Sequence, residues 1–322
     1  AQKNALIRKQ SAIETLSATS VICTDKTGTL TQNAMFAKKI WTADGIINIS
    51  GEGYGIDGQL TGITDQNRMT LENFFTAVSV CSNTEIHVAQ EDNSKWRVIG
   101  NPTEAAILIA ANKYGTDVKE RKEQFEIIEE IPFSSNTKQM SVLAVDKKHP
   151  AIDAGHTVQF TKGDPLKMIE LCSYLYKDGK PVVATAEMKQ QMKVFNDRMA
   201  NEGYRLLAIA YADRKAERNA STEGLILLGL AVMYDPPKEG VQEAIQDCYR
   251  AGIKVSVVTG DYSLTAAAIA RQIGIIKDKY VTVTGEEVEK MSQDELADRI
   301  NTELPVIFAR TTPKHKLKIV ET

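Results

Sequence analysis

Residues 20–31 constrain this chain more than any other segment, because they join a short apolar run to an aspartate and a glycine turn. They read Ser-Val-Ile-Cys-Thr-Asp-Lys-Thr-Gly-Thr-Leu-Thr, with Asp25 directly after the apolar residues and Gly28 three positions later. Buried parallel strands have this composition, and open α/β sheets place their chemistry in the loops at the carboxyl ends of such strands. An acidic residue after a strand can also cap the next helix. The segment therefore predicts a carboxylate that either caps a helix or reacts.

Composition places the chain among ordinary globular proteins. Of its 322 residues 43% are hydrophobic and 25% are charged, which suffices for one large domain or two moderate ones. The net charge is −3 and no basic run forms a patch, so we expect no nucleic-acid partner. No apolar stretch approaches the roughly 18 residues of a membrane span, and no signal peptide opens the sequence.

Cysteine and histidine spacing indicates neither disulfides nor a metal centre. The four cysteines are far apart and the four histidines show no ligand spacing. We interpret the cysteines as reduced thiols in a cytosolic setting.

The two ends of the chain alternate strand and helix, whereas the middle is richer in strands. Helices are expected at residues 3–17, 69–80, 102–114, 164–175, 185–202, 238–251, 263–273, 292–300 and 313–321. Strands are expected at residues 124–131, 139–146, 157–161, 204–211, 225–234, 254–258 and 305–309, with strand-and-turn character over 35–60. The pattern predicts a discontinuous α/β domain with a doubly wound parallel sheet, residues 1–34 plus 235–322. An α+β domain, residues 35–234, would be inserted within it.

The complete heptapeptide Asp-Lys-Thr-Gly-Thr-Leu-Thr, residues 25–31, resembles the signature of the P-type ATPases and the wider haloacid-dehalogenase-like fold. The resemblance implies that Asp25 attacks the γ-phosphate of ATP and becomes an aspartyl-phosphate. Lys26 and Mg²⁺ would offset the repulsion between the anions, with Asp25 and the Thr27 carbonyl as ligands of the metal. Related phosphatases carry a second aspartate, a general acid/base, at the position of Thr27. The phosphoenzyme should therefore persist, as a pump requires.

Two later segments resemble the other phosphate-site motifs of this family. Thr259-Gly260-Asp261 alone would be a turn, but in its context the Thr259 hydroxyl and the Gly260 amide would hold phosphate oxygens at a helix start. In residues 308–316, Lys316 would neutralise the phosphate and Arg310 would reach the nucleotide. The alternative for Lys316 is a place on a solvated helix face.

The inserted segment resembles the nucleotide-binding part of the family. Phe133 would stack on the adenine and Lys138 would face the phosphates. The alternative for Phe133 is a buried position in the hydrophobic core, which is more common for phenylalanine. Ser135 stands where the family often has an arginine. Lys162 and Gly163 are similar to the start of a Lys-Gly-Ala-Pro-Glu pocket, from which Asp164 and Leu166 depart.

Glu104 has two competing interpretations. It ends a segment that resembles a Gly-x-Pro-Thr-Glu motif, whose glutamate contacts the adenine. It also lies three residues after Asn101, a good N-cap, with Pro102 between them, so its side chain could reach back to the cap amide. Arg205 lies in a segment similar to the one whose arginine grips the nucleotide phosphates, and Asp235 opens a segment that resembles the return hinge.

The resemblance implies a parent cation pump of the type II, calcium-pump-like kind, on the cytoplasmic side of the cell membrane. Its partners would be ATP, the transported cation, and the actuator and transmembrane domains, with hinge closure between the two cytoplasmic domains during the cycle. The family's acidic Mg²⁺ motif does not occur before Thr322, so we expect a fragment that binds ATP weakly and turns over little. A stand-alone phosphatase of the same fold and a nucleotide-binding module without turnover are the alternatives.

Overall fold

The computed structural model describes residues 17–322 except residues 52, 90–94, 148–156 and 216–218. The expected helix at 3–17 lies, apart from its last residue, outside the described residues. The chain divides into two units. Unit 1 holds the described residues up to Asn33 together with Pro236–Thr322, and unit 2 is Ala34–Asp235.

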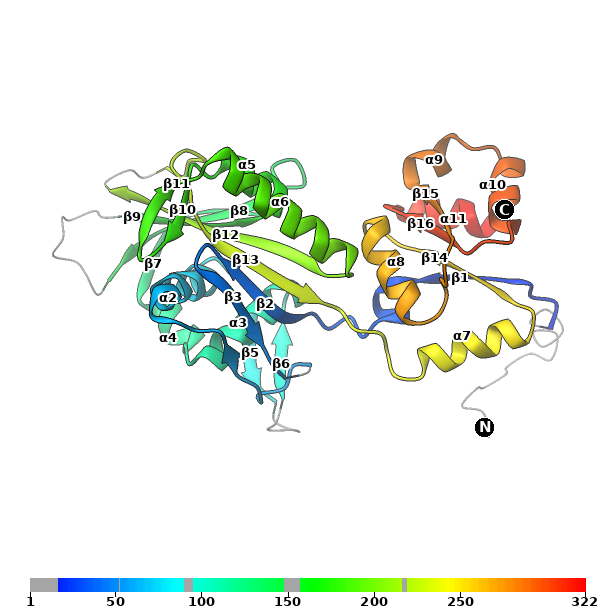
Figure 1. Cartoon of the computed structure of the whole chain (residues 1–322), viewed down its shortest axis with the longest axis horizontal. Helices are drawn as coiled ribbons and strands as arrows, with labels where there is room; N and C mark the ends of the chain where they lie inside the picture. Colours follow the sequence, from blue (N-terminus) through cyan, green and yellow to red (C-terminus); the bar gives the residue numbers. More distant parts are fainter. Residues whose placement is uncertain (1–16, 52, 90–94, 148–156, 216–218) are drawn as a thin grey trace. The chain divides into compact units, whose positions relative to one another are not determined.

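Unit 1 is built on a four-stranded parallel sheet with the order β1-β14-β16-β15 (Figure 1). The strands are β1 (Val21–Asp25), β14 (Lys254–Val258), β16 (Val306–Ala309) and β15 (Val281–Thr284). Asp25 pairs with Val258, and Val258 pairs with Phe308. The register therefore brings the loops after β1, β14 and β16 to the same edge of the sheet.

Helices follow the strands of unit 1. They are α7 (Val241–Arg250), α8 (Ser263–Gln272), α9 (Gly285–Lys290), α10 (Gln293–Asn301) and α11 (Pro313–Glu321). Capping boxes at Thr284, Ser292 and Thr312 begin the last three, because each hydroxyl accepts from an amide three residues on. Buried Phe308, Leu296 and Ile319 join these helices to the sheet. Helix α9 was not predicted.

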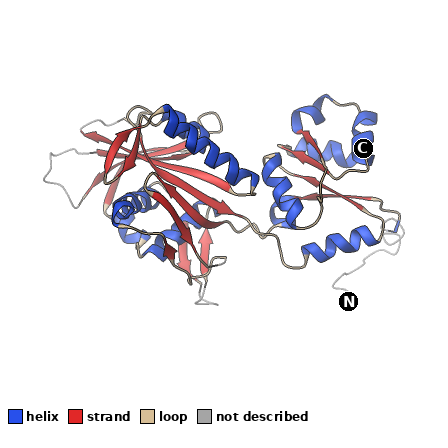
Figure 2. Cartoon of the chain, viewed as in Figure 1, coloured by secondary structure: helices blue, strands red, loops and turns tan. Residues whose placement is uncertain are grey.

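Unit 2 is built on a ten-stranded sheet, and Figure 2 shows how much of this unit is strand. Along its main path the strands are β4 (Leu60–Thr61), β3 (Gly45–Ile49), β2 (Phe36–Thr42), β13 (Ile226–Tyr234), β12 (Arg205–Lys215), β9 (Thr157–Gly163), β8 (Gln139–Asp146) and β7 (Phe125–Ile131). All neighbours along this path are antiparallel. A separate hairpin pairs β5 (Glu85–Val88) with β6 (Trp96–Ile99) and was not predicted.

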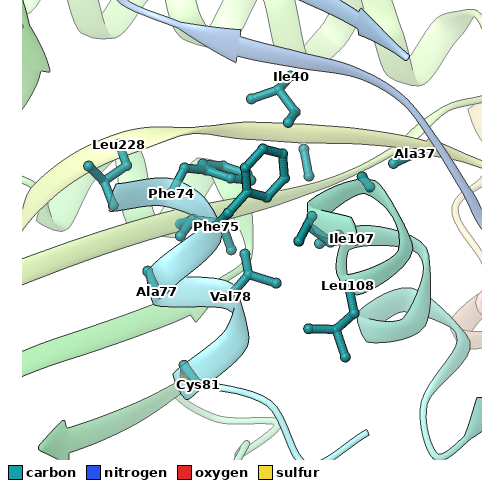
Figure 3. Close-up of a cluster of buried hydrophobic side chains, with 14 of the residues drawn as sticks. Ala37, Ile40, Phe74, Phe75, Ala77, Val78, Cys81, Ile107, Leu108 and Leu228 are labelled. Atoms are coloured by element: carbon teal, nitrogen blue, oxygen red, sulfur yellow. The ribbon is translucent and has the colours of Figure 1, made fainter. Parts of the chain in front are cut away.

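Helices cover both faces of the unit 2 sheet. On one face α2 (Asp65–Val80) and α3 (Pro102–Tyr114) pack Phe74, Phe75 and Ile107 against the strands (Figure 3). On the other, α5 (Pro165–Leu171) and α6 (Ala186–Asn201) contribute a second buried cluster. Strand β13 lies between the two clusters, which explains why its sequence is apolar throughout rather than alternating. The short α4 (Val118–Glu123) was not predicted.

The expected helix at 164–175 is wrong over its last four residues. Helix α5 ends at Leu171, and β10 (Tyr174–Lys177) then forms a hairpin with β11 (Lys180–Val183). The turn residues are Asp178 and Gly179, both with positive φ. An Asp-Gly pair with this geometry makes the tight turn that suits hairpins, and the aromatic residues before it favour a strand.

Among the described helices none is both long and apolar enough to cross a bilayer. The four cysteines, all within the described residues, form no disulfide.

Candidate functional site

The loop after β1 is a tight turn that only glycine fits well. Segment η1 (Lys26–Leu30) has φ/ψ of −77°/122° at Thr27 and 77°/−11° at Gly28, the angles of a type II turn. The second of these positions lies in the left-handed region, which explains Gly28. The Thr31 amide closes the loop by donating to the Lys26 carbonyl at 3.1 Å. The side chain of Asp25 is thereby held at the carboxyl end of β1.

Two lysine–carboxylate pairs meet at this edge of the unit 1 sheet. Lys316, from α11, forms an ion pair with Asp25 across 291 positions of sequence. Lys26 Nζ lies 2.6 Å from Asp261 Oδ2. The Lys26 side chain is only 6% exposed, whereas those of Asp25 and Lys316 are 41% and 36% exposed. The Lys26 ammonium is therefore largely shielded from water, although its partner Asp261 is 36% exposed, and the Asp25 carboxylate remains accessible.

Thr259 links the loops after β14 and β16. It is buried, its amide donates to the Phe308 carbonyl at 2.8 Å, and its hydroxyl accepts from the Asp261 amide at 3.1 Å. The Thr311 amide and hydroxyl both donate to the Thr259 carbonyl at 2.9 Å. A Cβ added at Gly260 would lie no closer than 3.5 Å to its nearest neighbour, the Thr311 carbonyl. Packing therefore tolerates a side chain at Gly260.

Arg310 stacks on Tyr262, which the sequence analysis did not single out. The guanidinium carbon lies 3.9 Å from the ring centroid, close enough for a cation–π interaction. Arg310 has a φ of 54°, and its amide donates to the Asp261 carbonyl at 3.0 Å. The signal for Tyr262 was its place directly after the Thr-Gly-Asp motif.

In unit 2 the structure brings Glu104 and Lys162 together. Lys162 Nζ lies 2.5 Å from Glu104 Oε1 and 2.5 Å from the Cys81 carbonyl. Both charged side chains are mostly buried. Burial tends to raise the pKa of Glu104, but the Lys162 charge and the hydrogen bonds from Lys162, Thr84 and Ser82 outweigh it and lower the pKa. Glu104 is therefore held as a carboxylate.

Glu104 does not act as the partner of its helix cap. The Asn101 side chain caps α3 by accepting from the Thr103 amide at 2.8 Å. The Asn101 amide donates to the Thr84 hydroxyl at 2.9 Å, the place that a capping glutamate would have taken. The Glu104 carboxylate is thus directed to Lys162 instead.

Phe133 is not a core residue, because its side chain is 65% exposed. It follows β7 and precedes a turn in which the Lys138 amide donates to the Ser134 carbonyl at 2.6 Å. The Lys138 carbonyl accepts from the Asp164 amide at 2.9 Å, so Lys138 lies beside the Lys162–Gly163 end of β9. A Cβ at Gly163 would come within 2.8 Å of that carbonyl. The close approach of the two strands therefore accounts for this glycine.

The remaining predicted residues lie elsewhere in unit 2. Arg205 is exposed at the start of β12, where it pairs with Met233. Asp235 is buried, and its Oδ1 accepts from the Ala34 amide at 3.3 Å. Across the described part of the chain, no three His, Cys, Asp or Glu side chains gather as metal ligands would.

Comparisons with known proteins agree with the architecture. Residues 70–240 match a family model described as "P-type ATPase, cytoplasmic domain N". A calcium-transporting ATPase of Listeria monocytogenes is 35% identical over an alignment that covers 100% of this chain and 34% of the relative. A calcium-transporting ATPase type 2C member 2 of Homo sapiens is 36% identical, with 100% and 32% covered, and a calcium-transporting ATPase of Bacillus subtilis is 33% identical, with 99% and 36% covered. The chain spans about a third of the length of these relatives. With just over half of its length matched by the family model, the chain belongs to the P-type ATPases.

Proposed function

We propose that unit 2 binds ATP and that Asp25 of unit 1 accepts its γ-phosphoryl group, within a pump that transports a cation. The observation that carries this proposal is the pairing of Asp25 with Lys316 beside the pair of Lys26 with Asp261. These groups come from the end of β1, the loops after β1 and β14, and helix α11 after β16, at the carboxyl edge of one parallel sheet, where such sheets hold their ligands. The arrangement supports a haloacid-dehalogenase-like role for unit 1.

In the proposed transfer, a carboxylate oxygen of Asp25 attacks the γ-phosphorus of ATP. The bond from that phosphorus to the β–γ bridging oxygen breaks, and ADP leaves. Lys316 lies beside Asp25 and would neutralise charge on the phosphoryl oxygens as the anions approach. Thr259 and the Gly260 amide would hold those oxygens, while Lys26 and Asp261 keep the loop after β14 beside η1.

Asp25 and the Thr27 carbonyl are the groups that would hold Mg²⁺. They fit such an ion, because both residues are accessible to water and Mg²⁺ prefers oxygen ligands while retaining several waters. When bound, the ion would offset the charge on the phosphate oxygens. Thr27 has no carboxyl group to activate water, so we expect the aspartyl-phosphate to persist.

For the nucleotide, exposed Phe133 would stack on the base, and Lys138 and Arg205 would contact phosphates. Glu104 and Lys162 would bind the base edge, with Gly163 beside them, and Asp235 would serve the return hinge. Arg310 of unit 1 would contact the nucleotide during transfer.

The parent's activity follows by inference from the relatives. Since these are named calcium-transporting ATPases, we infer a calcium pump whose actuator and transmembrane domains use the phosphorylation of Asp25 on the cytoplasmic side of the membrane. ATP would react in the cytoplasmic domains, whereas the cation would cross in the transmembrane domain. Domain motion must therefore couple the two events, and we propose that this motion is a hinge closure.

Labelling with γ-phosphate-labelled ATP and Mg²⁺ tests the transfer. The chain should acquire an acid-stable, hydroxylamine-sensitive label that Asp25→Asn abolishes. Asp247→Asn is the matched control, because this aspartate forms an exposed ion pair with Arg250 on the surface of α7, and the label should remain. If the chain binds ATP but acquires no label, it is a nucleotide-binding module without phosphoryl transfer. Rapid hydrolysis of small phosphoesters would instead indicate a phosphatase.

A further inference from the structure

Three consecutive residues wrap one oxygen of Glu104, and we call them the 82–84 loop. Glu104 Oε2 accepts from the Ser82 hydroxyl at 2.8 Å, the Thr84 hydroxyl at 2.7 Å and the Asn83 amide at 3.2 Å. Ser82 and Thr84 are both buried. The loop connects the end of α2 to β5, so its position is fixed by the core that α2 packs into.

The other oxygen, Oε1, faces Lys162. The ammonium of Lys162 also donates to the carbonyl of Cys81, the C-cap residue of α2. A helix carboxyl end favours a cation, so α2 fixes the lysine as well as the loop. A carboxylate offers about four accepting positions, two on each oxygen. Among the described residues Oε2 receives three donors and Oε1 receives Lys162 alone, so Oε1 is the oxygen with accepting capacity for a ligand.

We propose that the 82–84 loop sets base specificity: it orients Glu104 so that Oε1 accepts from a purine with a 6-amino group and rejects a 6-keto purine. This rests on the proposed function, which puts the base beside Glu104. Ser82 and Thr84 are then positioning residues, since they act through Glu104. They are a determinant separate from the residues that contact the nucleotide.

The chemistry of discrimination depends on Glu104 remaining charged and unable to turn. A protonated carboxyl could donate to a keto oxygen, but the Lys162 ammonium on Oε1 and the three donors around Oε2 favour the charged form, which only accepts. A site built to pair with one polar group rejects an analogue that presents the wrong one, because buried groups are left unpaired.

Other charged groups face this carboxylate through the loop. Lys122 of α4 donates to the Ser82 carbonyl at 2.6 Å, and Glu130 of β7 accepts from the Asn83 side chain at 2.7 Å. The Cys81 thiol is also close, but burial raises its pKa to about 11, so it stays neutral. Lys162 is therefore the one cation in direct contact with Glu104 among the described residues.

The test compares Thr84→Val with Thr84→Ser in the full 322-residue chain. Calorimetric titration with ATP and with GTP should show ATP binding about tenfold weaker in Thr84→Val and GTP binding unchanged, so that the ATP preference falls about tenfold. Thr84→Ser keeps the hydroxyl and should restore the preference. Ser82→Ala should act in the same direction, and it spares the bond between Thr84 and the Asn101 amide.

A second measurement follows the Glu104 carboxyl by carbon NMR during a pH titration. Losing either hydroxyl should raise the Glu104 pKa, because each one stabilises the charged form. An unchanged ATP-to-GTP ratio in both variants overturns the proposal, as does an unchanged pKa. If the parent chain binds no ATP, the proposed function fails instead, and the titration still decides whether the loop controls Glu104.

Discussion

Lys26 and Lys316 each form an ion pair with a carboxylate, but the two lysine side chains differ in their exposure to water. The Lys26 side chain is buried while its partner Asp261 is 36% exposed, so removing that aspartate would leave a mostly buried ammonium without its counter-ion. Lys316 and Asp25 are more than a third exposed, and such a pair contributes little to stability. The exposure of the second pair is compatible with the proposed role of Asp25, whose carboxylate would have to be accessible to ATP while Lys316 stays close.

Gly163 and Gly260 are glycines for different proposed reasons: close packing at Gly163 and phosphate binding at Gly260. Gly163→Ala should lower the free energy of unfolding by about 2 kcal/mol, because its Cβ would lie 2.8 Å from the Lys138 carbonyl. Gly260→Ala should change it by less than about 0.5 kcal/mol, since its Cβ has 3.5 Å of room. The same Gly260→Ala change should reduce labelling of Asp25, because the added methyl group would lie where the proposed function places the phosphate. Urea unfolding and labelling measure the two effects, and a stable, fully labelled Gly260→Ala protein would contradict the phosphate role.

The Glu104–Lys162 pair should contribute to the free energy of unfolding at neutral pH and lose this contribution at low pH. The pKa of Glu104 is lower in the folded protein, so its contribution is present above the unfolded pKa and is lost as the pH falls through the folded pKa. Lys162→Met should therefore cost about 3 kcal/mol at neutral pH and clearly less near about pH 4, measured by urea unfolding. Lys193→Met, which removes an exposed pair with Glu170, should show little cost at either pH. A pH-independent cost for Lys162→Met would argue against this pair as its source.

At the scale of elements, helix α11 carries two lysines, Lys316 and Lys318, that contact different groups. Lys316 reaches Asp25, while Lys318, two residues later, donates to the carbonyls of Val288 at 2.8 Å and Met291 at 2.7 Å. Those carbonyls end α9, where a cation is favoured by the helix dipole. Sequence alone makes the two lysines look equivalent.

Replacing each lysine with methionine should separate the contribution to stability from the role in phosphorylation. Lys318→Met should lower the free energy of unfolding by about 1 kcal/mol and leave labelling of Asp25 intact. Lys316→Met should have the reverse pattern, with labelling lost and stability nearly unchanged. Lys314→Met, on the exposed side of the helix, is the neutral control. Loss of labelling in a folded Lys318→Met protein would show that the assignment is wrong.

At the scale of the molecule, the two units differ in how the chain builds them. Unit 2 is continuous, and its ends meet: Tyr234 pairs with Phe36, and Asp235 accepts from the Ala34 amide. Unit 1 needs both segments, because β1 pairs with β14 over five positions and Thr31 bridges to Pro237.

Residues 34–235 should therefore fold when expressed alone and should bind ATP with an affinity within about twofold of the whole chain. Circular dichroism on heating and calorimetric titration would measure this. A fragment that is unfolded, or that binds at least tenfold more weakly, would show that unit 2 depends on unit 1.

Local signals in the sequence determined much of this fold. The strand before Asp25, the glycine turn at Gly28 and the Asn101 cap each depend on residues within a few positions of one another, so the sequence was enough to predict them. The β10–β11 hairpin also has a local signal, Asp178-Gly179, but the apolar run before it continues the periodicity of helix α5 and therefore predicts a longer helix. Short α4 and α9 have too few turns to give a clear period.

The partners of the charged residues were decided only by tertiary structure. Glu104 could equally have served its own helix cap, and it faces Lys162 because β9 and the 82–84 loop bring donors 58 and about 20 residues away to its carboxylate. Lys316 contacts Asp25 because strand register aligns the ends of β1, β14 and β16. Capping and turn formation are short-range, so sequence fixes them, whereas ion pairs between distant segments exist only once the sheet has been assembled.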